Sequence, residues 1–326
     1  MRNAKRRHFL EAAGVLLIAP LGARAQQPEK LRRVGVLSLF PPASVKGWSA
    51  IEPALSKRGW TSDRVRFEYR FADNQWDRLP ALAADLVRLG VDVIISDLGT
   101  TVAASRATSR IPIVMLFGLS EVEEGLTGSL GRPAKNITGL TGDVSAGVMS
   151  KRLELLREVV PQAKRIAFLT DPFPGNEVWI KNLENAAPRL GFAVQTVEVR
   201  APGDLDAAFD AIRRNDADCL FCGGDPVTFP QRARITQFAL EARLPGIHGV
   251  REFVEVGGLL SYGANLRETF AELLNYVDRI LRGAAPRDLP IMRPTKYELV
   301  VNRKTAKALG ITVPQSVLLR ADEVIE

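Results

Sequence analysis

The sequence predicts an α/β protein made of two doubly wound parallel-sheet lobes joined by a hinge. Three observations support this prediction. Short apolar runs rich in β-branched residues alternate with segments of helical periodicity along almost the whole chain. The chain has 326 residues, 46% of them hydrophobic, which is enough for two cores. Residues 138–143 are polar and glycine-bearing and separate two βα series, which is typical of a hinge or linker.

The clearest strand and turn lie at residues 91–101. Val91 to Ser96 is a continuous apolar run, as in a strand buried on both faces of a parallel sheet, and Gly99, Thr100 and Thr101 open the helix that follows. Open α/β sheets bind ligands at the carboxyl ends of their strands, and a helix start favours an anion. This turn is therefore the first candidate binding element.

The remaining elements follow from periodicity and from Gly or Pro at their ends. In the first series we expect strands at 34–39, 65–69, 111–117 and 136–140 and helices at 44–58 and 76–87. In the second series we expect strands at 165–170, 194–199, 218–222, 245–248, 258–261 and 297–301, and helices at 149–160, 179–190, 205–212, 235–242, 265–282 and 305–309.

The N-terminal segment, residues 1–25, is predicted to be a signal peptide cleaved after Ala25. A basic start precedes a short apolar stretch and the small-x-small sequence Ala23-Arg24-Ala25. The pair Arg6-Arg7 resembles the twin-arginine export pattern, although the general secretory route stays open. We therefore expect a periplasmic protein. The apolar stretch is too short to span a bilayer, so no integral membrane segment is expected.

The net charge does not indicate a nucleic-acid partner. Residues 1–25 carry five positive charges and one negative, so only +3 of the formal +7 belongs to the rest of the chain. A weakly charged mature protein lacks the basic footprint that nucleic acid requires, and no nucleic-acid partner is expected.

No motif for catalysis or for a cofactor stands out. The turn after the first strand, Leu39-Phe-Pro-Pro42, lacks the glycines of a dinucleotide site, and there is no Gly-x-Ser-x-Gly elbow. Cys219 and Cys222 lie on a predicted strand, where residues three apart point to opposite faces, so buried, unbridged thiols are favoured over a redox or zinc role. We expect no cofactor, no metal and no enzyme activity.

Several sequence segments together carry a resemblance to a known family. They are Arg33-Val-Gly-Val-Leu-Ser, Asp77-Arg-Leu-Pro-Ala-Leu, Asn136-Ile-Thr-Gly-Leu, Lys151-Arg-Leu-Glu-Leu-Leu, Gly257-Gly-Leu-Leu-Ser-Tyr-Gly and Pro294-Thr-Lys-Tyr-Glu-Leu-Val-Val-Asn. Over essentially its whole length the chain resembles the ABC-transporter substrate-binding proteins related to tryptophan and tyrosine binders. The resemblance implies a type I periplasmic-binding fold with three crossovers. The N-terminal lobe would comprise residues 32–141 and 264–288, and the C-terminal lobe 142–263 and 289–326.

In such a fold the ligand contacts come from strand ends that face the cleft. The candidates are Phe40, Gly99, Thr100, Thr101, Phe117 and Gly118 on the first lobe, and Asp171, Asn176, Asp225, His248 and Tyr262 on the second. Thr100 and Thr101 would hold a ligand carboxylate, with plain N-capping as the alternative. Asp225 would take an ammonium or hydroxyl, with a turn or cap aspartate as the alternative. Packing is an equal alternative for Phe40 and Tyr262, and a satisfied loop histidine is favoured for His248.

The resemblance implies an extracytoplasmic solute-binding component of an ABC importer. Closure of the two lobes would capture an amino-acid-like or carboxylate-bearing molecule, aromatic ones included. The expected partners are this small ligand and an ABC permease in the cytoplasmic membrane, with the protein itself a monomer. A periplasmic sensor that presents its closed form to a membrane receptor stays open as an alternative, as does an exported α/β enzyme.

Overall fold

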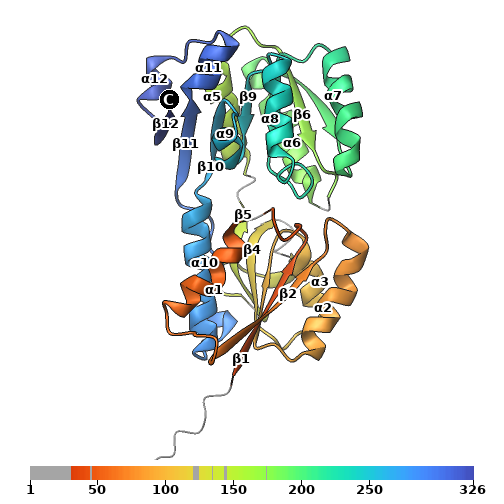
Figure 1. Ribbon diagram of the computed structural model, residues 1–326, viewed down its shortest axis with the longest axis vertical. Helices are drawn as coiled ribbons and strands as arrows, with labels where there is room; N and C mark the ends of the chain where they lie inside the picture. Colours follow the sequence, from red (N-terminus) through yellow and green to blue (C-terminus); the bar gives the residue numbers. More distant parts are fainter. Residues whose placement is uncertain (1–30, 45, 120–124, 134, 143–144, 174) are drawn as a thin grey trace, which may run out of the picture.

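The computed structural model describes residues 31–44, 46–119, 125–133, 135–142, 145–173 and 175–326. Two lobes are stacked along the long axis of the molecule (Figure 1). The predicted α/β fold class with two parallel-sheet lobes is confirmed. The predicted signal peptide lies outside the described residues. Within the described ranges, no helix combines the length and the apolar character needed to cross a membrane.

The first lobe is built on a five-stranded, wholly parallel sheet of order β2-β1-β3-β4-β5. Its strands are β1 (Arg32–Ser38), β2 (Val65–Phe71), β3 (Val93–Ser96), β4 (Ile113–Leu119) and β5 (Ile137–Gly142). Its helices are α1 (Lys46–Ser56), the 3-10 turn η1 (Trp76–Arg78), α2 (Leu79–Arg88), α3 (Thr100–Ala107), α10 (Leu266–Leu281) and the 3-10 turn η4 (Pro286–Asp288). Helices α1 and α10 pack on one face and α2 and α3 on the other, so both faces of the sheet are buried.

The second lobe contains a seven-stranded sheet of order β12-β11-β10-β9-β8-β6-β7. Its strands are β6 (Arg165–Thr170), β7 (Ala193–Glu198), β8 (Cys219–Cys222), β9 (Gly246–His248), β10 (Leu260–Ala264), β11 (Tyr297–Asn302) and β12 (Glu323–Ile325). Its helical segments are α5 (Ala146–Val159), α6 (Asn176–Ala186), η2 (Pro188–Leu190), η3 (Pro202–Asp204), α7 (Leu205–Arg214), α8 (Arg232–Glu241), α9 (Glu252–Glu255), α11 (Arg303–Leu309) and α12 (Gln315–Leu318). One pairing, β10 with β11, is antiparallel, because the chain visits the first lobe between these two strands.

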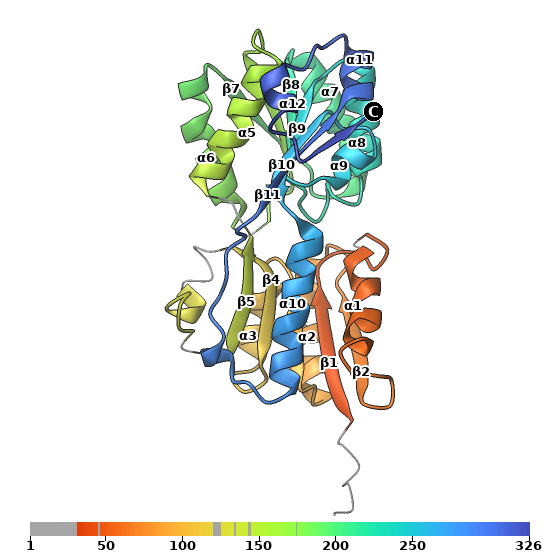
Figure 2. The same ribbon diagram turned by 90° about the vertical axis from the view of Figure 1, so that its left-hand side faces the viewer.

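Helix α10 follows a second-lobe strand in sequence but packs on the first lobe (Figure 2). It buries one face, including Leu273, Val277 and Leu281, in the core beneath α1. Trp60 donates its indole N–H to Asp278 at 2.7 Å and ties the helix to the loop after α1. The chain then pairs Met292 with Leu140 on β5 before it returns to the second lobe as β11. It therefore passes between the lobes three times.

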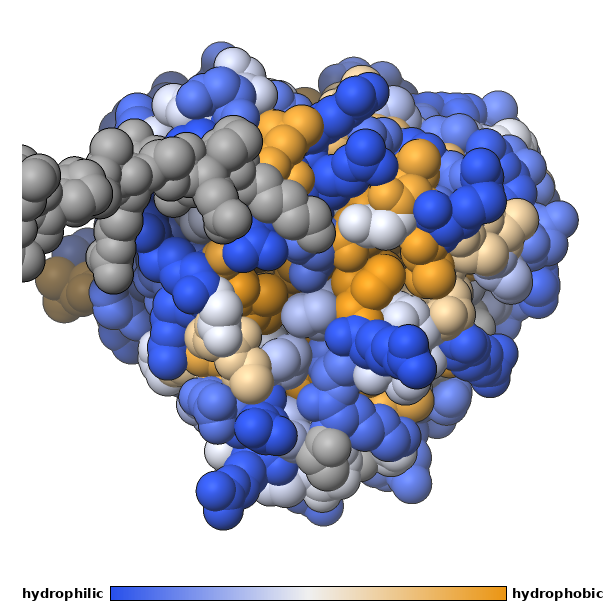
Figure 3. Space-filling view, turned by 90° about the horizontal axis from the view of Figure 1, so that it is seen from below, coloured by the Kyte–Doolittle hydropathy of each residue, from blue (hydrophilic) through white to orange (hydrophobic). Residues whose placement is uncertain are grey.

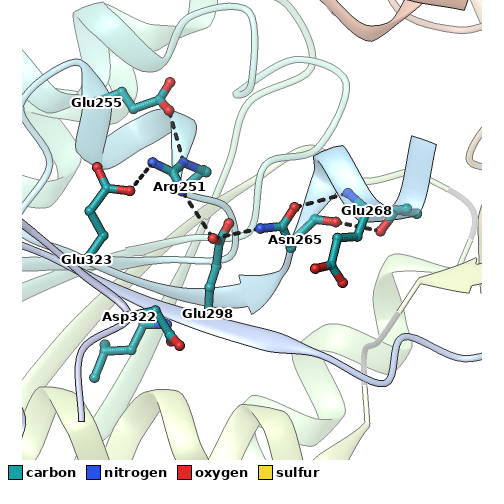
Figure 4. Close-up of polar contacts among 9 residues, drawn as sticks. Arg251, Glu255, Asn265, Glu268, Glu298, Asp322 and Glu323 are labelled. Carbon is teal, nitrogen blue, oxygen red and sulfur yellow. Dashed lines mark hydrogen bonds and ion pairs between the residues drawn. The ribbon is translucent and has the colours of Figure 1, made fainter. Parts of the chain in front are cut away.

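A polar network holds the beginning of α10 at the crossover (Figure 4). Asn265 caps the helix by accepting the backbone N–H of Glu268 at 3.0 Å, and its side-chain amide donates to Glu298 on β11 at 2.9 Å. Glu298 also accepts from Arg251, whose guanidinium contacts Glu255 and Glu323 as well. The N-cap residue of α10, Asn265, is thus anchored to β11 of the second lobe.

Residues 138–143 were predicted to be a hinge or linker. The structure corrects this prediction for residues 138–142, which belong to β5, and Asp143 lies outside the described residues. Gly139 has a φ of +126°, and a Cβ there would lie 2.2 Å from the carbonyl oxygen of Met115. The glycine therefore allows close approach of β4 and β5 and does not end the strand. The short elements α9, α12 and β12 were not predicted, because three or four residues show no periodicity.

Cys219 and Cys222 are free thiols on β8, and both are completely buried, which confirms the predicted buried strand. Burial raises the pKa of the Cys219 thiol to about 12. Both therefore act as small hydrophobic residues in the two cores that flank the sheet.

The surface at the far end of the first lobe mixes hydrophilic and hydrophobic residues (Figure 3). Among the described residues, the large hydrophobic side chains that are exposed are Leu31, Leu240, Val256, Met292 and Leu319. They are distributed over both lobes, and scattered exposed hydrophobic residues of this kind are ordinary for a protein surface.

Candidate functional site: a cavity between the lobes

A cavity of about 110 Å³ lies between the lobes, at the carboxyl ends of the parallel strands. From the first lobe its described lining comprises Phe40, Trp48, Asp97, Leu98, Leu116, Phe117, Gly142, Leu266 and Phe270. From the second lobe it comprises Arg152, Trp179, Gly223, Gly224, Phe229, Gly249, Val250, Ala264 and Pro294. Most of this surface is aromatic or aliphatic with a few polar groups, which is the usual composition of a small-molecule site.

Three aromatic rings form one wall on the first lobe. The ring of Phe270 on α10 meets Trp48 edge-on at a centroid distance of 5.6 Å and Phe117 at 6.3 Å. Phe117 has a φ of +59°, a left-handed conformation that is rare for a bulky residue. The pairing of β4 with β5 shifts register between Met115 and Gly118. This irregularity places Phe117 in the cavity lining, and such strained backbone is concentrated at functional sites.

Asp97 is the carboxylate among the described lining residues, and it is buried. One oxygen accepts the backbone N–H of Leu39 at 3.1 Å, and the other accepts the hydroxyl of Ser38. Burial raises the pKa of Asp97 to about 7, although these hydrogen bonds oppose the shift. The side chain links the ends of β1 and β3.

The second lobe presents glycines and one cation. A Cβ on Gly223 would lie 1.9 Å from the Trp179 ring, so the absence of a side chain there lets the indole pack directly on the backbone. Arg152 on α5 is 4% exposed, and its Nε donates to the carbonyl of Tyr262 at 2.8 Å. Its guanidinium carbon lies 5.9 Å from the centroid of the Phe221 ring. A positive charge is thus held at the cavity wall.

Two indole N–H groups of the lining are buried and find no hydrogen-bond partner among the described residues. They belong to Trp48 on the first lobe and Trp179 on the second. A buried donor without a partner costs about 1–3 kcal/mol. A bound molecule with acceptor atoms would supply the missing partners.

Aromatic contacts join the lobes around the cavity. Trp76 stacks on Phe173 with ring planes 4° apart and centroids 6.5 Å apart. Phe40 meets Phe229 edge-on at 6.1 Å. Leu98 packs against Phe173 in the same small apolar cluster. The two strand-end surfaces therefore touch, and the cavity lies between them.

Of the residues predicted on the first lobe, Phe40 and Phe117 line the cavity. The Thr100 hydroxyl donates to the carbonyls of Leu37 and Asp97, and the Thr101 hydroxyl pairs with Ser96. Both threonines are fully buried within their lobe. Gly99 and Gly118 are outside the lining as well. At Gly99 a Cβ would lie 2.6 Å from the Trp76 ring, so this glycine makes room for the aromatic contact between the lobes.

The residues predicted on the second lobe lie behind the wall. Asp225 accepts the N–H groups of Val227, Thr228 and Asp171. The Asn176 amide donates to the carbonyl of Asp171 at 2.8 Å. Burial, reinforced by the neighbouring Asp225 carboxylate, raises the pKa of Asp171 to about 7.

Two further predicted residues support the wall from the same side. The ring of His248 stacks on Phe253 with centroids 4.5 Å apart, and burial lowers the pKa of this histidine to about 3. The Tyr262 ring stacks on Tyr297, while the Tyr262 carbonyl holds Arg152. None of the five second-lobe candidates belongs to the described lining. No group of three or more His, Cys, Asp or Glu residues in the described chain could hold a metal ion.

Sequence analysis did not identify Arg152, Trp48 or Trp179 as site residues. Arg152 lies on the same helical face as Met149, Leu153 and Leu156, all of them buried. The position of an arginine on an apolar helix face could have indicated a functional role, because a buried charge is costly unless it has a partner. The two tryptophans sit at core-like helical spacings, so nothing in the sequence distinguishes them from packing residues.

Comparison with known proteins places this geometry in a family. A family model described as ABC transporter substrate binding protein matches residues 34–325. A protein named tyrosine-binding protein from Clostridioides difficile (strain R20291) is 24% identical over 287 residues, which cover 87% of this chain and 82% of the relative.

Solved structures show the same fold. A conserved domain protein from Vibrio cholerae superposes with a TM-score of 0.81 at 26% identity, covering 90% of this chain and all of the other. An ABC domain in complex with L-Trp from Streptococcus pneumonia has a TM-score of 0.80 at 22% identity, with the same coverage. The ligand-free, open structure of a substrate-binding protein with adhesive properties from Clostridium difficile has a TM-score of 0.63 at 23% identity, covering 90% and 99%.

Proposed function

We propose that this chain, which belongs to the family of ABC transporter substrate-binding proteins, is the extracytoplasmic solute-binding component of an importer. The observation that carries the proposal is the cavity of about 110 Å³ that residues of both lobes line where their strand ends touch. A small molecule held there would be surrounded by both lobes and buried from water.

Binding proceeds by closure of the lobes about their three connections. This is supported by the contrast between two solved structures. At 22% and 23% identity and equal coverage of this chain, the TM-score is 0.80 with the L-Trp complex and 0.63 with the ligand-free, open protein. The contacts of Trp76 with Phe173 and of Phe40 with Phe229 would break on opening and form again on closure.

The ligand is amino-acid-like or carboxylate-bearing, with aromatic members of this class included. The name of the Clostridioides difficile relative points to an amino acid with an aromatic ring. The lining of this chain supports the class independently, since aromatic rings surround one guanidinium, that of Arg152. The chain binds this ligand without transforming it and delivers it to a membrane permease. The predicted signal peptide supports a periplasmic location.

Mass spectrometry of the compound released by gentle denaturation of the purified protein tests the proposal. We expect one small organic molecule, and small-angle scattering should show a larger radius of gyration after its removal. If the protein converts this compound into a product when the two are mixed again, it would instead be an enzyme. Loss of uptake of this compound in cells that lack the protein would indicate transport, and unchanged uptake would indicate sensing.

A further inference from the structure

The polar groups of the cavity are unevenly divided between donors and acceptors. The Arg152 guanidinium and the indole N–H groups of Trp48 and Trp179 are donors. The two indole nitrogens are buried and have no partner among the described residues. Because buried donors in native proteins are almost always paired, a ligand with several acceptor atoms is the partner that this position favours.

The carboxylate of the described lining is hardly accessible to a ligand. Asp97 is 1% exposed, and its two oxygens accept hydrogen bonds from Leu39 and Ser38 within its own lobe. Asp225 could serve an ammonium by charge, but its oxygens accept three backbone N–H groups and it lies outside the lining. Burial of an ammonium group needs both a negative partner and acceptors for its three protons. The described lining offers no side chain that is ready for this task.

The size of the cavity sets a second limit. Its volume is about 110 Å³. An engineered apolar cavity of about 150 Å³ holds a benzene molecule. A ligand that fits within this volume is therefore compact, close to the size of a short branched acid or one small ring.

We propose that the ligand is a compact apolar carboxylate without an α-ammonium group, bound by Arg152 and the indole N–H groups of Trp48 and Trp179. Two oxygens of a carboxylate offer four acceptor positions, enough for a guanidinium and two single donors. The apolar remainder packs against the rings of Phe117, Phe229 and Phe270. This inference rests on the proposed function and narrows its ligand class to organic acids.

Calorimetry on the mature full chain, after removal of any co-purified compound, tests the inference with two matched pairs. These are 3-methylbutanoate against L-valine and 3-phenylpropanoate against L-phenylalanine, each pair differing only in the ammonium group. We expect the acid to bind at least about tenfold more tightly than its amino acid, because the ammonium loses its hydration without compensation. The smaller acid should bind better.

Substitutions that remove the N–H but keep an aromatic ring provide the second test. Trp48→Phe and Trp179→Phe should each weaken 3-methylbutanoate by about fivefold to tenfold. Trp60→Phe is the matched control, because Trp60 is outside the described lining and its N–H donates to Asp278. This variant should leave affinity unchanged.

The outcomes separate this inference from the proposed function. Equal or tighter binding of the amino acid in both pairs would overturn the inference and leave a solute-binding protein in place. Unchanged affinity in both tryptophan variants would also overturn it. If none of the four compounds binds and another solute co-purifies, the inference alone fails. If no small molecule binds or co-purifies, the proposed function fails as well.

Discussion

In both lobes an aspartate follows a central strand and accepts a backbone N–H from the end of the neighbouring strand, but the two aspartates differ in their position relative to the cavity. Asp97 follows β3 and accepts the N–H of Leu39, which follows the neighbouring strand β1. Asp225 follows β8 and accepts the N–H of Asp171, which follows the neighbouring strand β6. In each lobe a buried aspartate thus joins the ends of two adjacent parallel strands. Only Asp97 also belongs to the cavity lining.

This difference shows what a polar residue at a strand end does by default. Backbone N–H groups at the carboxyl ends of parallel strands need acceptors once they are buried, and a short carboxylate supplies them. The cavity is then lined mainly by the residues beside the aspartate. On the second lobe these are Gly223 and Gly224, where the missing side chains let Trp179 and the cavity approach the backbone.

The largest expected effect is on folding and comes from Asp225→Ala. Three backbone N–H groups would lose their acceptor, and each unpaired buried donor costs about 1–3 kcal/mol. Removal of a buried charge offsets part of this, so we expect the free energy of unfolding in urea to fall by about 3 kcal/mol. Asp210→Ala on the exposed side of α7 should change it by less than about 0.5 kcal/mol.

The same variant distinguishes a structural aspartate from a ligand-binding one. Because Asp225 lies outside the cavity lining, the folded fraction should bind the co-purified compound with wild-type affinity. A large loss of affinity at unchanged stability would contradict a structural role for Asp225. It would instead support the ligand contact that was predicted from the sequence.

Substitution of Gly223 should have the next largest effect, on affinity. In Gly223→Ala the new Cβ would lie 1.9 Å from the Trp179 ring, so the indole must leave its position in the wall. Overpacking of this kind costs about 1–3 kcal/mol, which corresponds to a loss of affinity of about tenfold to a hundredfold. Gly203→Ala is the control, since a Cβ at that position would have no other atom within 4 Å. Wild-type affinity in Gly223→Ala would show that this wall does not contact the ligand.

Much of the fold was predictable, because both lobes repeat strong local signals. Apolar β-branched runs and helical periodicity identified every described strand except β12. The family was recognised separately, from the resemblance of several sequence segments, and the family model confirms it. The antiparallel pairing of β10 with β11 was not visible, because it depends on the return of α10 to the first lobe. A local pattern carries no information on such long-range pairing.

The site was less predictable than the fold. Strand position correctly indicated where the cavity would lie but not which side chains face it. The hydroxyls of Thr100 and Thr101 bond within their own lobe, whereas Phe117 reaches the lining through an irregular strand and a left-handed backbone. Side-chain direction at a strand end is set by the turn geometry, which the residue pattern does not specify.

Removal of aromatic contacts between the lobes should have a moderate effect on ligand affinity. Trp76 and Phe173 stack across the interface, and such aromatic pairs contribute about 0.5–1.5 kcal/mol beyond their buried area. In a double-mutant cycle of Trp76→Leu and Phe173→Leu, the coupling energy measured from ligand affinity should fall in this range. Strictly additive losses of affinity would mean that the pair does not stabilise the ligand-bound form.

The smallest expected effect is a change in pH dependence, and it compares the lobes directly. Burial raises the pKa of Asp97 to about 7, and burial together with Asp225 raises the pKa of Asp171 to about 7. An unfolded aspartate has a pKa of about 3.9, so the folded state binds more protons between about pH 4 and 7. Each group therefore lowers the free energy of unfolding as pH rises through this window. Asp97→Asn and Asp171→Asn should each flatten that decline, measured by urea unfolding at pH 5 and pH 8. The pKa of Asp171 also depends on the charge of Asp225. Asp171→Asn should therefore change the pH dependence less when Asp225 is also replaced, whereas the effect of Asp97→Asn should persist. The same decline in wild type and in both variants would contradict the prediction.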